Sequence, residues 1–212
     1  MPVIQISYSS SAFEDSARQL SAKLDLPQRT EHSADYDYLL DFSKSGLSLV
    51  PSADKGYGPI QCDFAGGTHS HRRRFGGGNG QAIAKAIGVS GKFSPQVVDL
   101  TAGLGGDAFV LACLGCTVTM LERNPIVHSL LADGLTRAAI SAEDDVELKD
   151  IVRRISLIEA NSAEYLEQGA GLVSADVVYV DPMFPERKKS AKVKKQMQAF
   201  HAIVGADLDA DK

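Results

Sequence analysis

The first segment that could carry chemistry is VVDLTAGLGGDAF, residues 97–109, in which an apolar run ends in an acidic residue and is followed by glycines. Gly103, Gly105 and Gly106 allow a tight turn whose main-chain N–H groups can approach a ligand closely. Asp107 then opens an apolar stretch that predicts a helix, and the N-terminal end of a helix carries a partial positive charge. The spacing therefore predicts a nucleotide-binding turn between a strand and a helix.

Glu122 adds a second part to the same site. It closes a predicted strand and follows Gly103 by about 20 residues, the spacing at which a carboxylate accepts hydrogen bonds from the hydroxyls of an adenosine ribose. This favours adenosine recognition without naming the cofactor. Gly103, Gly105 and Ala108 also satisfy the G-x-G-x-x-G/A pattern of dinucleotide-binding proteins, so a nicotinamide-dependent oxidoreductase is an alternative at this point.

The second segment that could carry chemistry is VVYVDPMFP, residues 177–185. Pro182 and Pro185 cannot donate to a strand ladder, so the strand ends and leaves Asp181 in a loop. The nitrogen of an aromatic exocyclic amine is a poor nucleophile because its lone pair is delocalised into the ring. The Asp181 carboxylate and the Pro182 carbonyl could accept hydrogen bonds from the two N–H groups of such an amine, and Phe184 could stack on the base. The nitrogen lone pair can then be directed at a methyl group. This turn therefore favours methylation of an exocyclic amine over hydride transfer.

Alternating strands and helices must position these two segments. We expect strands at residues 97–100, 117–121, 155–159 and 177–180, and helices at 107–114, 126–138 and 162–168. Such alternation predicts a parallel sheet with right-handed crossovers, and ligands bind outside the carboxyl ends of its strands. The predicted fold is α/β, with a Rossmann-like class I methyltransferase sheet. Sheets of this class normally have more strands, so we expect the sheet to be incomplete at the C-terminus and the sequence to be shorter than the natural one.

We expect three parts along the chain: a small α+β N-terminal domain at residues 1–60, a basic, glycine-rich bridge at 61–95, and the methyltransferase domain at 96–212. The bridge is predicted to contain a helix near residues 81–87. The N-terminal domain is predicted to hold a strand at residues 3–8, a helix at 11–24 and a hairpin around Ser45-Gly46. Ser11 and Glu14 have the spacing of a capping box at the start of that helix.

Composition is that of a globular protein: of 212 residues, 44% are hydrophobic and 23% are charged. The longest apolar stretch, residues 108–121, contains Gly115 and is shorter than the roughly 18 to 20 residues that cross a bilayer. The start, MPVIQISYSS, lacks a basic region followed by an apolar core. We therefore predict a cytoplasmic protein with no membrane partner.

The chain has three cysteines, Cys62, Cys113 and Cys116, an odd number that fits a reducing compartment. Cys113 and Cys116 form a C-x-x-C, but a zinc site needs two more ligands, and His69 and His71 are the nearest histidines. We predict no metal, because a buried cysteine commonly serves as a small apolar side chain.

Positive charge is concentrated although the formal net charge is −5. Of 22 lysines and arginines, two clusters stand out, formed by Arg72, Arg73, Arg74, Arg187, Lys188, Lys189, Lys192, Lys194 and Lys195. The second cluster directly follows the loop at Asp181, and a predicted helix at residues 191–203 carries part of it. Both clusters are candidates for holding an RNA backbone. A solvated basic helix face is the alternative for the second.

Five segments together resemble a known family: HRRRFGGGNGQAIAKAIG, DLTAGLGGDAF, LERNP, VYVDPMFP and KKSAKVKKQM. They are similar to ribosomal RNA small subunit methyltransferase J, whose members use S-adenosylmethionine to methylate a guanine N2 in bacterial 16S rRNA. The likeness runs from about residue 60 to the end of the chain. It implies S-adenosylmethionine as the cofactor, and 16S rRNA or the small ribosomal subunit as the partner.

The resemblance also implies site residues. Asp181 would lie where the cofactor and the target amine meet, with Pro182 and Phe184 beside it, and the predicted cofactor-binding residues are Gly103, Gly105, Gly106, Asp107, Glu122, Arg123, Asn161, Ser162 and Asp181. The chemistry of the side chains agrees, since Asp107 suits the methionine ammonium group, Glu122 the ribose, and Asn161 or Ser162 the adenine edge. Two departures are Met183, which separates the proline from the aromatic residue, and Asn161, where the family often has serine.

Three alternatives differ in substrate or class. The first is an exocyclic-amine methyltransferase that acts on adenine or on transfer RNA, since the spacing does not select guanine. The second is the nicotinamide-dependent oxidoreductase. The third is a non-catalytic RNA-binding module that keeps the fold.

Overall fold

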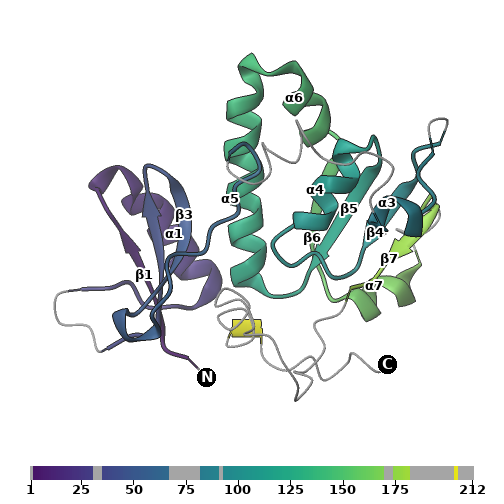
Figure 1. Cartoon of the computed structure of the whole chain (residues 1–212). Helices are drawn as coiled ribbons and strands as arrows, with labels where there is room; N and C mark the ends of the chain where they lie inside the picture. The colour runs from purple at the N-terminus through teal and green to yellow at the C-terminus, as the bar shows by residue number, and fades with distance from the viewer. Residues whose placement is uncertain are drawn as a thin grey trace. The chain divides into compact units, whose positions relative to one another are not determined.

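The computed structural model describes residues 2–30, 35–66, 82–90, 93–169, 174–181 and 203–204. They fall into two compact units, one made mainly by residues up to Gln61 and the other by Cys62–Asp181 (Figure 1). Several predictions lie outside the described residues: the helix at 191–203, and the roles of Arg72, Arg73, Arg74, Pro182, Phe184, Arg187, Lys188, Lys189, Lys192, Lys194 and Lys195.

The N-terminal unit contains a three-stranded sheet in the order β1-β2-β3. β1 (Ile4–Tyr8) pairs in parallel with β2 (Tyr38–Ser43), which pairs antiparallel with β3 (Gly46–Pro51). The predicted hairpin is confirmed, and Gly46 takes a φ of 103° that favours glycine at the turn. Ile6, Leu40 and Leu49 form part of the core of this unit.

The first helix of this unit begins differently from its prediction. A 3-10 turn, η1 (Ser11–Phe13), precedes α1 (Glu14–Leu24). The capping side chain is Ser10, whose hydroxyl oxygen accepts a hydrogen bond from the Ala12 N–H over 3.2 Å. The predicted capping box at Ser11 and Glu14 is therefore wrong, because the tighter 3-10 turn shifts the first unpaired N–H groups toward the N-terminus. A second 3-10 turn, η2 (Ala53–Lys55), follows β3.

The second unit contains the predicted parallel sheet, in the order β6-β5-β4-β7. Its strands are β4 (Gln96–Asp99), β5 (Thr117–Glu122), β6 (Ile155–Glu159) and β7 (Val177–Tyr179). The chain runs outward from β4 through β5 to β6 and then returns to the other side of β4. The order of the strands therefore reverses between β4 and β7, and such a reversal marks the ligand-binding edge of an open α/β sheet.

The helices of this unit are α3 (Ala82–Ala86), α4 (Gly106–Cys113), α5 (Pro125–Ser141), α6 (Val146–Val152) and α7 (Ser162–Gln168), with a 3-10 turn η4 (Ala142–Asp144). Both α4 and α5 pack against β5 and β6 (Figure 1). The sequence did not predict α6, whose short apolar pattern rests on Leu148 and Ile151. Asp145 caps it by accepting a hydrogen bond from the Leu148 N–H.

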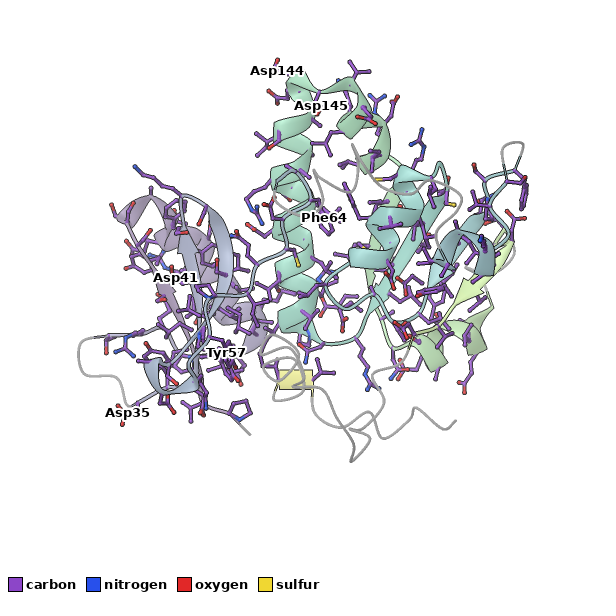
Figure 2. The ribbon with its side chains drawn as sticks, viewed as in Figure 1. Asp35, Asp41, Tyr57, Phe64, Asp144 and Asp145 are labelled. Atoms are coloured by element: carbon purple, nitrogen blue, oxygen red, sulfur yellow. The ribbon has the colours of Figure 1, made fainter. Side chains whose placement is uncertain are left out.

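Phe64 belongs to the segment that precedes the parallel sheet, and it helps to fix the position of the glycine turn. Its ring stacks on Phe109 of α4, with ring centroids 5.4 Å apart, and it also lies beside α5 (Figure 2). A side chain at Gly134 of α5 would meet Cys62 at 2.7 Å, so only glycine lets this segment approach the helix. Arg137 of α5 also donates to the Cys62 carbonyl.

Cys62 and Cys116 are buried, and none of the three cysteines forms a disulfide in the part of the chain that the structure describes. The part of the chain that the structure describes contains no group of three His, Cys, Asp or Glu residues placed to hold a metal ion. Among the same residues, no helix is both long enough and apolar enough to cross a membrane.

Candidate active site

Asp99 lies at the carboxyl end of β4, where the chain leaves the sheet for the glycine turn. It is only 1% exposed, and its Oδ1 accepts a hydrogen bond from the Thr101 N–H over 3.0 Å. Burial raises the pKa of this carboxyl to about 6, and the nearby charges of Asp107 and Asp181 add to the shift, against the hydrogen bonds from Thr101. Three acidic side chains therefore lie near one another at this edge of the sheet.

The glycines of the turn have different roles. Gly103 and Gly105 take positive φ values of 55° and 72°. A side chain at Gly105 would meet Leu131 and Phe64 at 2.9 Å, so this glycine lets the turn pack onto the unit's own core. A side chain at Gly106 would meet nothing within 4 Å. The turn therefore presents open space at Gly106, at the N-terminus of α4, where a ligand can approach the main chain.

Glu122, at the carboxyl end of β5, is 8% exposed. Its Oε1 accepts a hydrogen bond from the Asn124 N–H over 2.7 Å. Burial raises the pKa of Glu122 to about 7, although the Asn124 and Gly103 amides lower it. The Gly103 amide thus links Glu122 to the glycine turn. A buried carboxylate with such a pKa gains most from ligand hydroxyl groups that donate to its charged form.

Asp107, in the first turn of α4, accepts a hydrogen bond from the hydroxyl of Tyr179 over 2.9 Å. Burial raises the pKa of Tyr179, and the bond to Asp107 adds to the rise. Tyr179 therefore stays protonated and acts as a donor. The Asp107 carboxylate has a second oxygen, Oδ1, which can accept from a cationic ligand.

Asp181 is an exposed residue two positions after the end of β7. Its backbone N–H donates to the Thr101 hydroxyl over 2.8 Å. This hydrogen bond joins the loop that follows β7 to the loop that follows β4. The two segments that the sequence singled out therefore lie side by side, at the point where the strand order reverses.

Asn161 and Ser162 have structural partners. The Asn161 Oδ1 accepts the Ala163 N–H over 2.9 Å and caps α7. The Ser162 hydroxyl donates to the Leu100 carbonyl over 2.6 Å. Both side chains thus shape the loop after β6 and hold it beside the loop after β4. Arg123 is exposed and next to Glu122.

Sequence reasoning did not include Asp99, Thr101 and Tyr179 in the site. The sequence could have indicated Asp99, because an acidic residue ends the apolar run VVD at the carboxyl end of a predicted strand. Tyr179 had a weaker signal, as the only residue with a polar atom in its side chain within the run VVYV. Thr101 had none, because a threonine after a strand is common, and only the path of the β7 loop shows that its hydroxyl accepts a hydrogen bond from Asp181.

Comparison with known proteins identifies the family. A family model described as "Putative SAM-dependent methyltransferase" matches residues 19–212. A ribosomal RNA small subunit methyltransferase J from Cellvibrio japonicus is 49% identical over 207 residues, which cover 95% of this chain and 78% of the relative. The chain belongs to the ribosomal RNA small subunit methyltransferase J family. The predicted family and its S-adenosylmethionine dependence are thereby confirmed.

Further members and a solved structure agree. The methyltransferase J of Cronobacter sakazakii is 51% identical over 180 residues, covering 85% of this chain and 70% of the relative. The crystal structure of a SAM-dependent methyltransferase from Neisseria gonorrhoeae matches with a TM-score of 0.66 and 31% identity, covering 95% of this chain and 74% of that chain. The predicted Rossmann-like fold of this methyltransferase J family member is confirmed. The oxidoreductase alternative is set aside, because the family uses S-adenosylmethionine.

Proposed function

We propose that this protein transfers the methyl group of S-adenosylmethionine to the exocyclic N2 of a guanosine in bacterial 16S rRNA. The observation that carries the proposal is the hydrogen bond between the Asp181 N–H and the Thr101 hydroxyl. It holds the loop suited to an exocyclic amine against the loop suited to an adenosine cofactor. The choice of 16S rRNA rests on the names of the relatives, which are ribosomal RNA small subunit methyltransferases.

The residues around the glycine turn fit S-adenosylmethionine. Glu122 is buried, and its carboxylate faces the turn, where ribose hydroxyl groups can donate to it. Asp107 can accept from the methionine ammonium group with the oxygen that Tyr179 leaves available. Gly106 borders the open space that the cofactor needs. When bound, the cofactor supplies an electrophilic methyl group on a sulfonium.

Asn161 and Ser162 shape the adenine side of this site. Their side chains bond to the protein, so we propose that they fix the path of the loop after β6. On this path the backbone groups of the loop can face the adenine edge. Arg123 stays among the proposed cofactor-binding residues through its place directly after Glu122.

Asp181 belongs to the part of the site that we propose binds the methyl-accepting amine. Its side chain is exposed at the edge of the sheet, so its carboxylate can accept a hydrogen bond from one N–H group of the guanine amine. This hydrogen bond would turn the nitrogen lone pair toward the methyl group. Pro182 supplies a carbonyl for the second N–H bond and Phe184 a face for stacking; both roles rest on the sequence. After the transfer the nitrogen is positively charged and acidic, so it loses its proton to water and no strong base is required beforehand.

The two basic clusters suit the rRNA backbone. Arg72, Arg73 and Arg74 precede the methyltransferase sheet, and the run from Arg187 to Lys195 follows the Asp181 loop. Charge reversal at Lys188 and Lys189 should therefore weaken binding to the small subunit while leaving cofactor affinity unchanged. A ribosomal substrate also supports the proposal that the protein works in the cytoplasm.

Mass-spectrometric mapping of 16S rRNA methylation, with and without this protein, tests the proposal. We expect one guanosine to gain a methyl group at N2 only when the protein is present. A methyl group on an adenine or on transfer RNA would contradict the proposed substrate. The cofactor is tested separately: S-adenosylhomocysteine should raise the melting temperature, and NAD should not.

A further inference from the structure

Two side-chain hydroxyl groups connect the loops after β4 and β7 in a reciprocal way. Thr101 belongs to the β4 loop and accepts the backbone N–H of Asp181 over 2.8 Å. Tyr179 belongs to β7 and donates to Asp107, at the start of α4, over 2.9 Å. Each segment thus supplies a hydroxyl group to the other. We call this pair of hydrogen bonds the hydroxyl brace.

The brace begins where the backbone pairing of the two strands ends. The Leu100 N–H donates to the Tyr179 carbonyl over 3.0 Å, which continues the parallel ladder just past β4. Beyond this point the chain turns away into the glycine loop. The N–H of Asp181 bonds to the side chain of Thr101, so a hydroxyl group extends the connection after the strands separate.

From this geometry we infer that Thr101 and Tyr179 are positioning residues, which set the distance between the cofactor site and the target amine. The inference rests on the proposed function, in which Asp107 faces the cofactor and Asp181 faces the amine. Neither hydroxyl group needs to touch a reacting atom. A methyl group is transferred in line over a short distance, so a small displacement of one loop against the other lowers the rate.

The two halves of the brace should affect different steps. Tyr179 orients Asp107, so its hydroxyl group should matter for cofactor affinity. Thr101 holds the main chain at Asp181, so its hydroxyl group should matter for the rate at saturating cofactor. Burial raises the pKa of Tyr179, which keeps this phenol a donor at every pH at which the protein is assayed.

The test measures S-adenosylmethionine affinity by calorimetry and the methylation rate of 16S rRNA by single-turnover kinetics, on the full chain. Tyr179→Phe should raise the dissociation constant for the cofactor about tenfold, which corresponds to about 1.4 kcal/mol of binding free energy. Thr101→Val, which keeps the shape and removes the hydroxyl group, should leave that constant unchanged and lower the rate about tenfold. Thr101→Ser should restore the rate, because it restores the hydroxyl group.

Matched controls remove hydroxyl groups elsewhere in the same unit. Thr136→Val takes away a hydroxyl group that donates to the Ala132 carbonyl on α5, and Tyr165→Phe takes away a phenol on α7. Both should retain wild-type affinity and rate. Thermal melting of every variant shows whether it is folded, and Thr101→Ala, which also removes the hydroxyl group, replaces Thr101→Val if that variant is unstable.

The outcomes separate the brace from the proposed function. Wild-type affinity in Tyr179→Phe together with wild-type rate in Thr101→Val would overturn the brace. A rate that Thr101→Ser fails to restore would also overturn it, since shape rather than the hydroxyl group would then be the cause. A wild-type protein that binds the cofactor but leaves 16S rRNA unmethylated would contradict the proposed function. The cofactor affinity of Tyr179→Phe would still test whether Tyr179 positions Asp107.

Discussion

The Ser162 hydroxyl donates a hydrogen bond to the carbonyl of Leu100 over 2.6 Å, across two loops that are far apart in the sequence. Leu100 follows β4, and Ser162 begins α7 after β6. These loops lie at the carboxyl edge of the same sheet, and the bond satisfies a carbonyl that has left the strand ladder. The loop after β6 is therefore held in place by its own side chains before any cofactor binds.

Ser162→Ala should lower the free energy of unfolding by about 1 kcal/mol, the usual net contribution of such a hydrogen bond. Cofactor affinity should fall only slightly, because the main chain of the loop can still face the adenine. Urea unfolding and calorimetry measure the two effects. Unchanged stability with a large loss of affinity would mean that the hydroxyl group contacts the cofactor directly.

The glycine turn allows a comparison of two neighbouring positions. Gly105→Ala should lower the free energy of unfolding by about 2 to 4 kcal/mol, because its φ is positive and the new methyl group would meet Leu131 and Phe64. Gly106→Ala should leave the fold as stable or slightly more stable, since alanine favours helix and meets nothing there.

Cofactor affinity distinguishes these glycines further. If the open space at Gly106 belongs to the cofactor, Gly106→Ala should weaken S-adenosylmethionine binding while the melting temperature holds. Wild-type affinity in Gly106→Ala would show that the cofactor does not approach the turn at this position.

Glu122 should make cofactor binding depend on pH. Its pKa is raised to about 7 in the ligand-free protein, and ribose hydroxyl groups donate best to the ionised carboxylate. The dissociation constant for S-adenosylmethionine should therefore rise as the pH falls from about 8 to about 6. Glu122→Gln should bind about 1 to 3 kcal/mol more weakly at the higher pH and lose most of this dependence. A wild-type constant that does not change over this range would contradict the role of Glu122.

Asp99 should make the stability of the ligand-free protein depend on pH. Burial raises its pKa in the folded state to about 6, above the usual value of 3.8, so folding favours the protonated form. The stabilisation is present below the unfolded-state pKa and is lost as the pH rises through the folded-state pKa. Asp99→Asn imitates the protonated form and still accepts from Thr101. It should match the wild-type stability near pH 4 and exceed it by about 1 to 3 kcal/mol near pH 7.5.

Urea unfolding of the two proteins at both pH values checks this prediction. The difference between the proteins isolates Asp99 from the other carboxyl groups, of which Asp37 and Asp54 have lowered pKa values and act in the opposite direction. An Asp99→Asn variant that is less stable than the wild type at pH 7.5 would show that the carboxylate is paired in the folded state.

Asp181→Asn should abolish rRNA methylation while the protein stays folded and binds the cofactor. The side chain is exposed, so its replacement costs little stability, and the backbone N–H that bonds to Thr101 is kept. An asparagine side chain can offer only one acceptor oxygen and adds donors that repel the N–H bonds of the amine. Full methylation activity in this variant would remove the Asp181 carboxylate from the mechanism.

The sequence predicted the elements of the sheet well because their signals are local. The apolar runs VVD and VVYV read as buried strands, and Asn161 followed by Ser162 marks the start of α7. Glu122 could be placed at the edge of the sheet because parallel strands end together. Such inferences need only spacing and the direction of the chain.

The predictions that failed or were missed depend on contacts between segments. The cap at Ser10 required knowing that the first turn is a 3-10 turn. The partners of Thr101 and Tyr179 depend on how closely the loops after β4 and β7 approach, which no local pattern records. The place of Asn161 and Ser162 at the adenine edge stays a prediction, and the structure adds that both side chains also bond to the protein.

The central claim is that one cofactor site, bordered by the ends of β4, β5 and β7, lies beside Asp181. A crystal structure of the protein with S-adenosylhomocysteine tests it most directly. We expect both ribose hydroxyl groups within hydrogen-bond distance of the Glu122 carboxylate, the amino group at Asp107 and the sulfur facing the Asp181 loop. Density for the ligand away from Glu122, or a sulfur turned from Asp181, would contradict the claim.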